Sequence, residues 1–280
     1  MLTARVIPVL HVKGPNLVKG VHLEGLRVLG RPEAFAKHYY EQGADELVFL
    51  DTVASLYGRN TLYEIVERVA DQVFIPLTVG GGVRSVEGAL RLLRAGADKV
   101  AVNTAAVRRP VLLQELAGAL GSQAVVLYIE AKARGSWWEC LTDNARESSG
   151  RDVLEWVQEA VALGVGEVLL CSVDRDGTRS GYDLDLTFAV STAVTVPVVG
   201  LGGAGNPQDC VQVLREGKAD AVAAASLFHY PVAGELNTKG QAQEGNTEFL
   251  AGRRGAEPRW QGSVRGVKAV MAQAGVEVRW

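Results

Sequence analysis

The sequence predicts an α/β protein folded as a single (β/α)8 barrel, a TIM barrel with a half-barrel internal repeat. Eight short apolar runs alternate with amphipathic segments, and glycine-rich turns recur along the chain. The second half of the chain also echoes the first. A length of 280 residues suits one such barrel. An open doubly wound sheet is the alternative, but eight similar units favour closure.

The eight apolar runs are rich in Val and Leu, as is typical of strands that are buried on both faces. The expected strands are RVIPVL (5–10), ELVFLD (46–51), IPLTV (75–79), KVAVN (99–103), AVVLYIE (124–130), EVLLCSV (167–173), VPVVGL (196–201) and AVAAA (221–225). Four of the intervening helices have clear ends: residues 32–43, 85–96, 150–164 and 206–217. Each of them stops at a glycine, and Ser85 and Asn206 are suitable N-caps.

Residues 76–107 resemble residues 197–228 in the order strand, glycine cluster, helix, strand and small polar turn. This repetition suggests a duplicated half-barrel. We expect one domain over residues 1–280, with a loop inserted at about 231–262 before the last helix. That stretch is rich in glycine and charge and has no clear period.

Composition excludes several classes of function. The net charge of −3 argues against nucleic acid, and no apolar run is long enough to span a membrane. The three cysteines are scattered without metal-ligand spacing and fit reduced thiols in a cytoplasm. We therefore expect a cytoplasmic protein that needs no metal and no cofactor.

Glycine clusters follow the third and seventh expected strands, at residues 80–82 and 202–203. Glycine lets the backbone approach an anion and direct N–H groups at it. The turns NTAA (103–106) and AASL (224–227), after the fourth and eighth strands, add small residues and helix N-termini, which attract phosphate. The pattern predicts two phosphate sites half a barrel apart, although glycines that only permit tight turns are the alternative.

Further candidates stand at the carboxyl ends of expected strands, where barrel enzymes place their active sites. His11 ends the first strand, and Lys19 follows in a loop where it could clamp a phosphate. Asp174, Asp176 and Gly177 follow the sixth strand, where they form either a ligand loop or a solvated turn.

Ionisable residues also stand at the opposite ends of four expected strands. Arg5, Glu46, Lys99 and Glu167 lie at or near the starts of the first, second, fourth and sixth strands. Buried charges need partners, so two positive and two negative groups predict a neutral ring at the barrel floor. Such a ring is either a set of structural ion pairs or a gate.

The motifs KGVHLEGLR, GADELVFLD, FIPLTVGGGVRSVE, RAGADKVAVNTAAV, DRDGTRSGYDLDLT and AASLFHY resemble the cyclase subunit of imidazole glycerol phosphate synthase, from histidine biosynthesis. The resemblance covers roughly residues 1–230 and the last helix. It implies a glutaminase subunit bound at the N-terminal barrel face. Ammonia would pass through the barrel to a bisphosphorylated ribonucleotide-like substrate.

The resemblance also implies roles for particular residues. It makes Arg5, Glu46, Lys99 and Glu167 an ammonia gate, and it assigns Asp98 to the partner interface. It assigns Gly82, Asn103 and Thr104 to one phosphate and Gly177, Gly203, Ala225 and Ser226 to the other. Lys19 and Asp176 are further substrate-binding candidates because of their positions in the chain.

The chain departs from the family pattern where the chemistry occurs. His11 and Glu130 stand where the family has its two catalytic aspartates, and Cys171 and Leu201 replace small hydroxyl residues. His11 can serve as an acid or base near neutral pH but cannot supply an aspartate's negative charge. These departures predict altered or weakened cyclase activity.

A paralogous group is also similar to this chain. KGPNLVKGVHLEGLRVLG, VASLYGRNTL, IEAK and EGNTEFL resemble cyclase-like proteins of surface-polysaccharide gene clusters. Beside the synthase subunit itself, two alternatives stay open. The chain either channels ammonia from a glutaminase to a sugar amidotransferase, or binds a phosphorylated ligand without catalysis and activates a glutaminase.

Overall fold

The computed structural model describes residues 3–53, 61–236 and 263–280. Within them, eight parallel strands form a closed barrel, because β10 pairs with β7 and so joins the two ends of the strand order. The barrel strands are β1 (Arg5–Lys13), β4 (Leu47–Asp51), β5 (Leu77–Gly80), β6 (Lys99–Val102), β7 (Val125–Arg134), β10 (Glu167–Ser172), β11 (Val198–Leu201) and β12 (Ala221–Ala224). The predicted barrel is confirmed.

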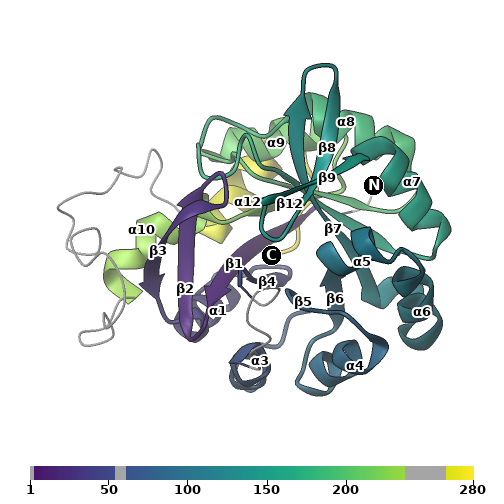
Figure 1. The fold of residues 1–280 in the computed structure, drawn as a ribbon. Helices are drawn as coiled ribbons and strands as arrows, with labels where there is room; N and C mark the ends of the chain where they lie inside the picture. The colour runs from purple at the N-terminus through teal and green to yellow at the C-terminus, as the bar shows by residue number, and fades with distance from the viewer. Residues whose placement is uncertain (1–2, 54–60, 237–262) are drawn as a thin grey trace.

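Helices surround the strands and cover the outside of the barrel (Figure 1). They are α1 (Pro32–Glu41), α3 (Thr61–Ala70), α4 (Val86–Arg94), α5 (Thr104–Arg108), α6 (Val111–Leu120), η1 (Ser122–Ala124), α7 (Val153–Ala162), α8 (Leu184–Ala193), α9 (Pro207–Arg215), α10 (Ser226–Leu236) and α12 (Val264–Gln273). The expected caps form: the Ser85 side chain accepts from Gly88 N–H, and Asn206 forms a capping box with Asp209. None of the described helices has the length and apolarity that a membrane crossing requires.

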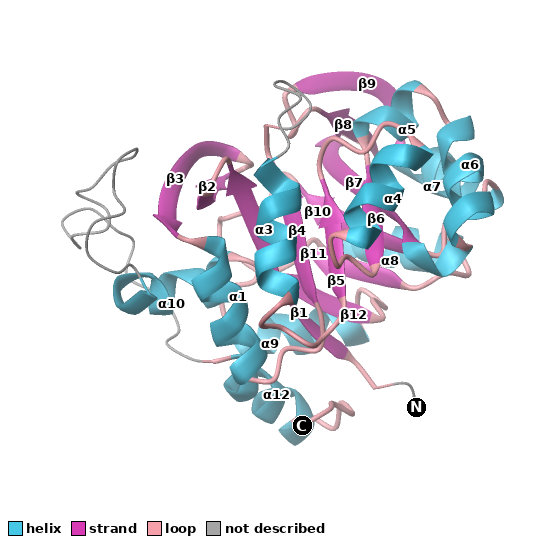
Figure 2. Cartoon of the chain, turned by 90° about the horizontal axis from the view of Figure 1, so that it is seen from below, coloured by secondary structure: helices cyan, strands magenta, loops and turns pink. Residues whose placement is uncertain are grey.

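Two antiparallel hairpins extend the barrel at one end. The β2 strand (Asn16–Val21) pairs with β1 and with β3 (Glu24–Gly30), while β8 (Trp137–Thr142) pairs with β7 and with β9 (Glu147–Asp152). Both hairpins project from the carboxyl ends of the barrel strands, whereas both chain termini lie toward the opposite end (Figure 2). The hairpins therefore lie at the end of the barrel where active sites form.

Two apolar layers account for the packing. One fills the space between the strands and the outer helices, and the other fills the barrel lumen. Because side chains alternate along a strand, Ile7, Val9 and His11 share the inner face of β1. The inner layer is made of Ile7, Val9, Val48, Leu50, Ala101, Val126, Tyr128, Leu169, Cys171, Val199, Leu201, Ala221, Ala223 and Ala225, which we call the lumen cluster.

Two expectations about loops need correction. Lys19 lies on β2 rather than in a loop, because a turn at Gly14 returns the chain antiparallel to β1. The expected loop at 231–262 begins too early, since α10 continues to Leu236 and packs against α1 and β3. Its remaining residues, 237–262, lie outside the described part of the chain.

Candidate active site

The four charged residues at the strand starts form a closed ring of ion pairs. Arg5 donates to Glu46 and Glu167, each at 2.7 Å. Lys99 lies 3.0 Å from Glu46 and 3.1 Å from Glu167. Thr78 adds a hydrogen bond of 2.5 Å to Glu46. Both carboxylates are therefore paired with both cations, as the sequence predicted for a neutral ring.

Asp98 is exposed beside this ring and also has a structural contact. Its carboxylate accepts from the backbone N–H of Leu77, at the start of the neighbouring strand β5, at 2.8 Å. Asp45 and Asp220 make the equivalent contact to the neighbouring strands β1 and β11, also at 2.8 Å. The three aspartates each fix the start of a neighbouring strand, in two Gly-Ala-Asp sequences and one Lys-Ala-Asp sequence, and this structural role of Asp98 was not predicted.

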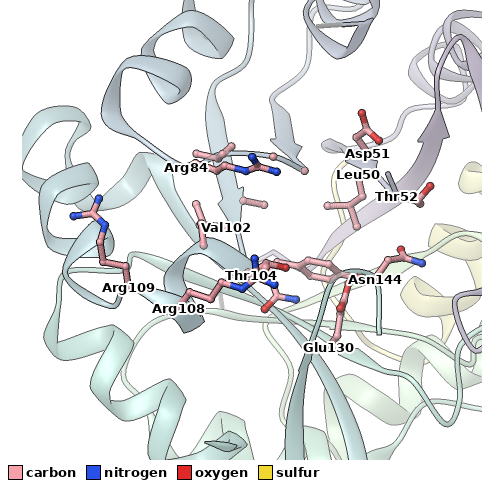
Figure 3. Close-up of a pocket in the computed structure, with 17 residues that line it drawn as sticks. Leu50, Asp51, Thr52, Arg84, Val102, Thr104, Arg108, Arg109, Glu130 and Asn144 are labelled. Atoms are coloured by element: carbon pink, nitrogen blue, oxygen red, sulfur yellow. The ribbon is translucent and has the colours of Figure 1, made fainter. Parts of the chain in front are cut away.

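At the opposite end, a cavity of about 270 Å³ opens at the carboxyl ends of β4 to β7. Gly82, Asn103 and Thr104, which were predicted to bind one phosphate, all line it. Arg84 and Arg108 extend toward this cavity from one side, and Glu130 and Asn144 from the other (Figure 3). The cavity therefore has a cationic wall facing a carboxyl group.

The polar side chains of this cavity are held by the β8–β9 hairpin. Asn103 donates to the carbonyl of Leu141 at 3.1 Å, and Thr104 accepts from the N–H of Asp143 at 3.0 Å. Arg108 donates to the Asp143 carboxylate at 2.6 Å. The side-chain carbonyl oxygen of Asn103 is buried without a partner, so it can accept a hydrogen bond from a ligand.

Glu130 lies in the middle of β7, where the strand begins to pair with β8, and its carboxyl group is buried. Burial raises its pKa from 4.5 to about 7, against the lowering effect of a 2.8 Å hydrogen bond from the N–H of Ala145. A carboxyl group that titrates near neutral pH can both accept and return a proton, which is the property of a general acid–base group.

His11 differs from Glu130 in its protonation. Its side chain is 2% exposed, and both ring nitrogens are buried without a hydrogen-bond partner. Burial and the nearby Lys19 ammonium lower its pKa to about 4, although Asp176 partly offsets them. His11 is therefore a neutral imidazole at physiological pH, with one donor and one acceptor available.

Lys19 and Asp176 form an ion pair beside His11. The ammonium lies 2.7 and 2.9 Å from the two carboxylate oxygens, and each side chain is 2% exposed. Asp176 also accepts from the N–H of Leu23 at 3.1 Å. Although burial alone would raise it, the pKa of Asp176 is lowered by Lys19 and His11. The pair holds the β2–β3 hairpin against the loop that follows β10.

The second predicted phosphate site has too little space for a phosphate in this structure. Gly177, Gly203, Ala225 and Ser226 line one cavity of about 10 Å³, room for about one water molecule. A Cβ at Gly177 would lie 2.5 Å from the carbonyl oxygen of Gly20, so the hairpin backbone packs directly on this glycine. The Ser226 hydroxyl, at the start of α10, is buried without a partner.

The structure gathers most of the predicted residues in three groups: the floor ring, the cavity near Glu130, and the small cavity near Ser226. The last two cavities share no lining residue. Lys19 lines neither of them but, with Gly177, lines a further cavity of about 360 Å³ beside the β2–β3 hairpin. Arg108 and Tyr128, which line the cavity near Glu130, were not among the predicted residues. The alternation of side chains along a strand could have found Tyr128, which precedes Glu130 by two residues. No group of three or more candidate metal ligands gathers anywhere in the described ranges.

The closed barrel, with buried ionisable groups at the carboxyl ends of its strands, places the chain among (β/α)8-barrel enzymes. The family described as "Histidine biosynthesis protein" matches residues 5–233. The chain belongs to this family, as its motifs predicted.

Two named relatives make the comparison more specific. The chain is 56% identical to "Imidazole glycerol phosphate synthase subunit HisF" of Legionella pneumophila over 210 residues, which cover 75% of this chain and 99% of that protein. It is 51% identical to the protein of the same name from Streptococcus sanguinis (strain SK36) over 250 residues, which cover 89% and 99%. The similarity therefore extends over nearly the whole of each relative.

Proposed function

We propose that this chain is the cyclase subunit of an imidazole glycerol phosphate synthase in histidine biosynthesis, acting in the cytoplasm. In this proposal a glutaminase subunit binds the N-terminal barrel face and delivers ammonia through the lumen. At the opposite end, the ammonia reacts with a bisphosphorylated ribonucleotide-like substrate. The relatives named as subunits of that synthase support the proposal.

One observation carries the proposal: a ring of charges, an apolar lumen and a titratable carboxyl group follow one another along the barrel axis. The ring of Arg5, Glu46, Lys99 and Glu167 closes the floor, and the lumen cluster lines the interior above it. Neutral ammonia crosses such an interior far more easily than ammonium, because an apolar lumen offers a charge no compensation.

Glu130 is the acid–base group of the proposed reaction. Its pKa of about 7 leaves a mixture of both forms at neutral pH, so it can take a proton from the attacking nitrogen and return it later. His11 acts differently, as a neutral hydrogen-bonding group, because its pKa of about 4 keeps it unprotonated. Of these two residues at the mouth, Glu130 therefore exchanges protons near neutral pH and His11 does not.

The substrate's two phosphates would occupy the two mouth cavities. The cavity near Gly82, Asn103 and Thr104 has space and cations for one of them. The cavity near Gly203 and Ser226 has little space in this structure, and in this proposal it widens for the other phosphate as the β2–β3 hairpin withdraws from Gly177. Substrate binding is then coupled to separation of the Lys19–Asp176 pair, which frees the lysine to bind phosphate.

The N-terminal face has features that suit a partner. Phe74, just before β5, is 76% exposed, and Asp98 is exposed at the start of β6. Arg5 and Lys99 retain partial exposure within the ring, so a bound subunit could reach them. An exposed aromatic side chain beside charged groups is typical of an interface anchor.

The test uses the purified full chain and the bisphosphorylated substrate, with imidazole glycerol phosphate measured as product. We expect product with ammonium salt alone, and with glutamine once the glutaminase subunit is added. The Lys99→Met variant should lose more of the glutamine-dependent rate than of the ammonium-dependent rate, because it breaks the ring but leaves the mouth intact. Absence of product under both conditions would refute cyclase activity.

A second candidate function is favoured by the uncharged His11. A neutral imidazole cannot stabilise a developing cation as a carboxylate does, so the barrel could supply ammonia to a separate sugar amidotransferase. A related variant is a non-catalytic phospho-ligand binder that activates the glutaminase. Both forms of this candidate predict faster glutamine hydrolysis by the partner, without imidazole glycerol phosphate, when the chain is added.

A further inference from the structure

The turn of the β8–β9 hairpin has a backbone conformation that its residues do not favour. Asp143, Asn144 and Ala145 follow one another with φ values of 54°, 59° and 60°. Aspartate and asparagine tolerate this left-handed region, but alanine rarely adopts it because its Cβ approaches a neighbouring carbonyl oxygen. Three such residues in succession persist only where surrounding contacts hold them. Contacts outside this 143–145 turn therefore keep it in place.

Asp143 attaches the 143–145 turn to α5. Its N–H donates to the Thr104 hydroxyl at 3.0 Å, and its carboxylate accepts from Arg108 at 2.6 Å. The Asp143 side chain is only 7% exposed, so its charge needs a partner, whereas a fully exposed pair would contribute little. Arg108 also donates to Glu147 at 3.2 Å, but that carboxylate is 60% exposed. The ion pair with Asp143 is therefore the contact of Arg108 that constrains the turn.

At its other end the 143–145 turn contacts the acid–base group. The N–H of Ala145 donates to the Glu130 carboxyl group at 2.8 Å. Arg108 and Glu130 extend from opposite sides of the cavity near Glu130, and both line it (Figure 3). Asp143 and Ala145 are two residues apart, so a displacement of one moves the other. The turn thus connects Arg108 to Glu130.

We propose that Arg108 is a positioning residue for Glu130: its ion pair with Asp143 fixes the 143–145 turn, and the turn holds the Ala145 N–H against the Glu130 carboxyl group. A hydrogen bond from a fixed N–H sets the orientation of a carboxylate and favours its ionised form. The catalytic consequence rests on the proposed cyclase function, whereas the contacts between Arg108 and Glu130 do not.

The other groups around Glu130 act on its charge. Burial raises the pKa of Glu130, Tyr128 and Arg146 lower it, and Asp143 raises it. Cys171 lies opposite on β10, and burial raises the pKa of its thiol, so it stays protonated. Loss of the Arg108 guanidinium would leave the Asp143 charge uncompensated, which favours the protonated form of Glu130 even if nothing moves. A test must therefore separate a change in charge from a change in position.

The Arg108→Met variant removes the guanidinium, and Arg109→Met is its matched control. Arg109 is the next residue and lines the same cavity, but it pairs with Glu115 at 2.7 Å instead of with the turn. The readout is the NMR shift of the Ala145 amide proton during a pH titration of the full chain. This proton should shift as Glu130 ionises, because a hydrogen bond to a carboxylate is the stronger one, and Glu130→Gln should abolish the shift.

In wild type the Ala145 amide should shift with a midpoint near pH 7. The size of this shift should fall by about half or more in Arg108→Met and be retained in Arg109→Met, because the hydrogen bond weakens steeply with misalignment. Asp143→Asn breaks the same ion pair but changes the local charge in the opposite direction, so a fall in both variants cannot come from charge alone. A midpoint that moves while the size of the shift is unchanged would overturn the proposal.

Kinetics give a second readout. With ammonium salt as nitrogen source, Arg108→Met should lower kcat about tenfold, and by more than Arg109→Met does, because a displaced acid–base group slows the chemical step. A rise in KM with kcat unchanged would indicate a role in binding alone and contradict the proposal. If the wild-type chain makes no product, the cyclase proposal fails, whereas the amide titration still decides the role of Arg108.

Discussion

Replacing Glu130 with glutamine should make the protein more stable and less active, and the gain in stability should depend on pH. The folded chain holds a proton on Glu130 at pH values where the unfolded chain has released it, because burial raises the pKa of Glu130 from 4.5 to about 7. The wild-type chain therefore loses stability as pH rises through this window. Glutamine carries no titrating proton and escapes that loss.

The magnitude follows from the width of the window. The difference between 4.5 and about 7, at about 1.36 kcal/mol for each pH unit, corresponds to roughly 3 kcal/mol. We expect Glu130→Gln to gain up to this amount over wild type between about pH 5 and pH 8 in urea unfolding. Ammonium-dependent kcat should fall by about 100-fold or more, since the acid–base group is gone.

Glu139→Gln, on the adjoining hairpin strand β8, is a control for which we expect a change in stability of the opposite sign. Although burial alone would raise it, hydrogen bonds from Ser148, Gly150 and Arg134 lower the pKa of Glu139. This variant should therefore lose stability relative to wild type at neutral pH. If the difference between Glu130→Gln and wild type is the same at pH 5 and pH 8, the raised pKa of Glu130 is wrong.

Two further predictions concern the closed mouth. Asp176→Asn leaves the Lys19 ammonium buried without its partner and should cost about 3–5 kcal/mol in urea unfolding at neutral pH. Because the pKa of Asp176 is lowered, this cost should shrink under acid conditions. The Lys19→Met/Asp176→Leu double variant should recover part of the lost free energy of unfolding, and no recovery would contradict the account. Gly203→Ala should lower Tm, because a Cβ there lies 2.0 Å from the carbonyl oxygen of Gly181 and the glycine has φ +102°. An unchanged Tm would contradict this prediction, because it would mean that the backbone at Gly181 and Gly203 accommodates the Cβ without loss of stability.

The barrel could be predicted because its signal is local. Each strand is a short Val- and Leu-rich run that ends at a turn, and that signal needs no knowledge of distant partners. Strand ends were less certain, since β1 continues to Lys13 and β7 to Arg134. Both extensions exist because a hairpin pairs with them, and hairpin pairing depends on contacts that a run of apolar residues does not encode.

The candidate site was only partly predictable. Positions such as Glu130 and Ser226 follow from their place at strand ends, but their surroundings do not. Lys19 and Asp176 are 157 residues apart in sequence, so their ion pair could be found only in three dimensions. The burial that separates the pKa values of His11 and Glu130 is also a property of the assembled mouth rather than of either strand.

The β2–β3 and β8–β9 hairpins contact each other at their turns, so movement of one hairpin is coupled to movement of the other. Leu23 of the first hairpin packs with Leu141 and Ala145 of the second, and Asn144 donates to the carbonyl of Leu23 at 2.9 Å. The hairpins grow from barrel strands that are half a barrel apart in sequence order, β1 and β7. Each half of the barrel thus supplies one of the two hairpins that contact each other. A ligand that displaces either hairpin removes contacts that hold the other one in place.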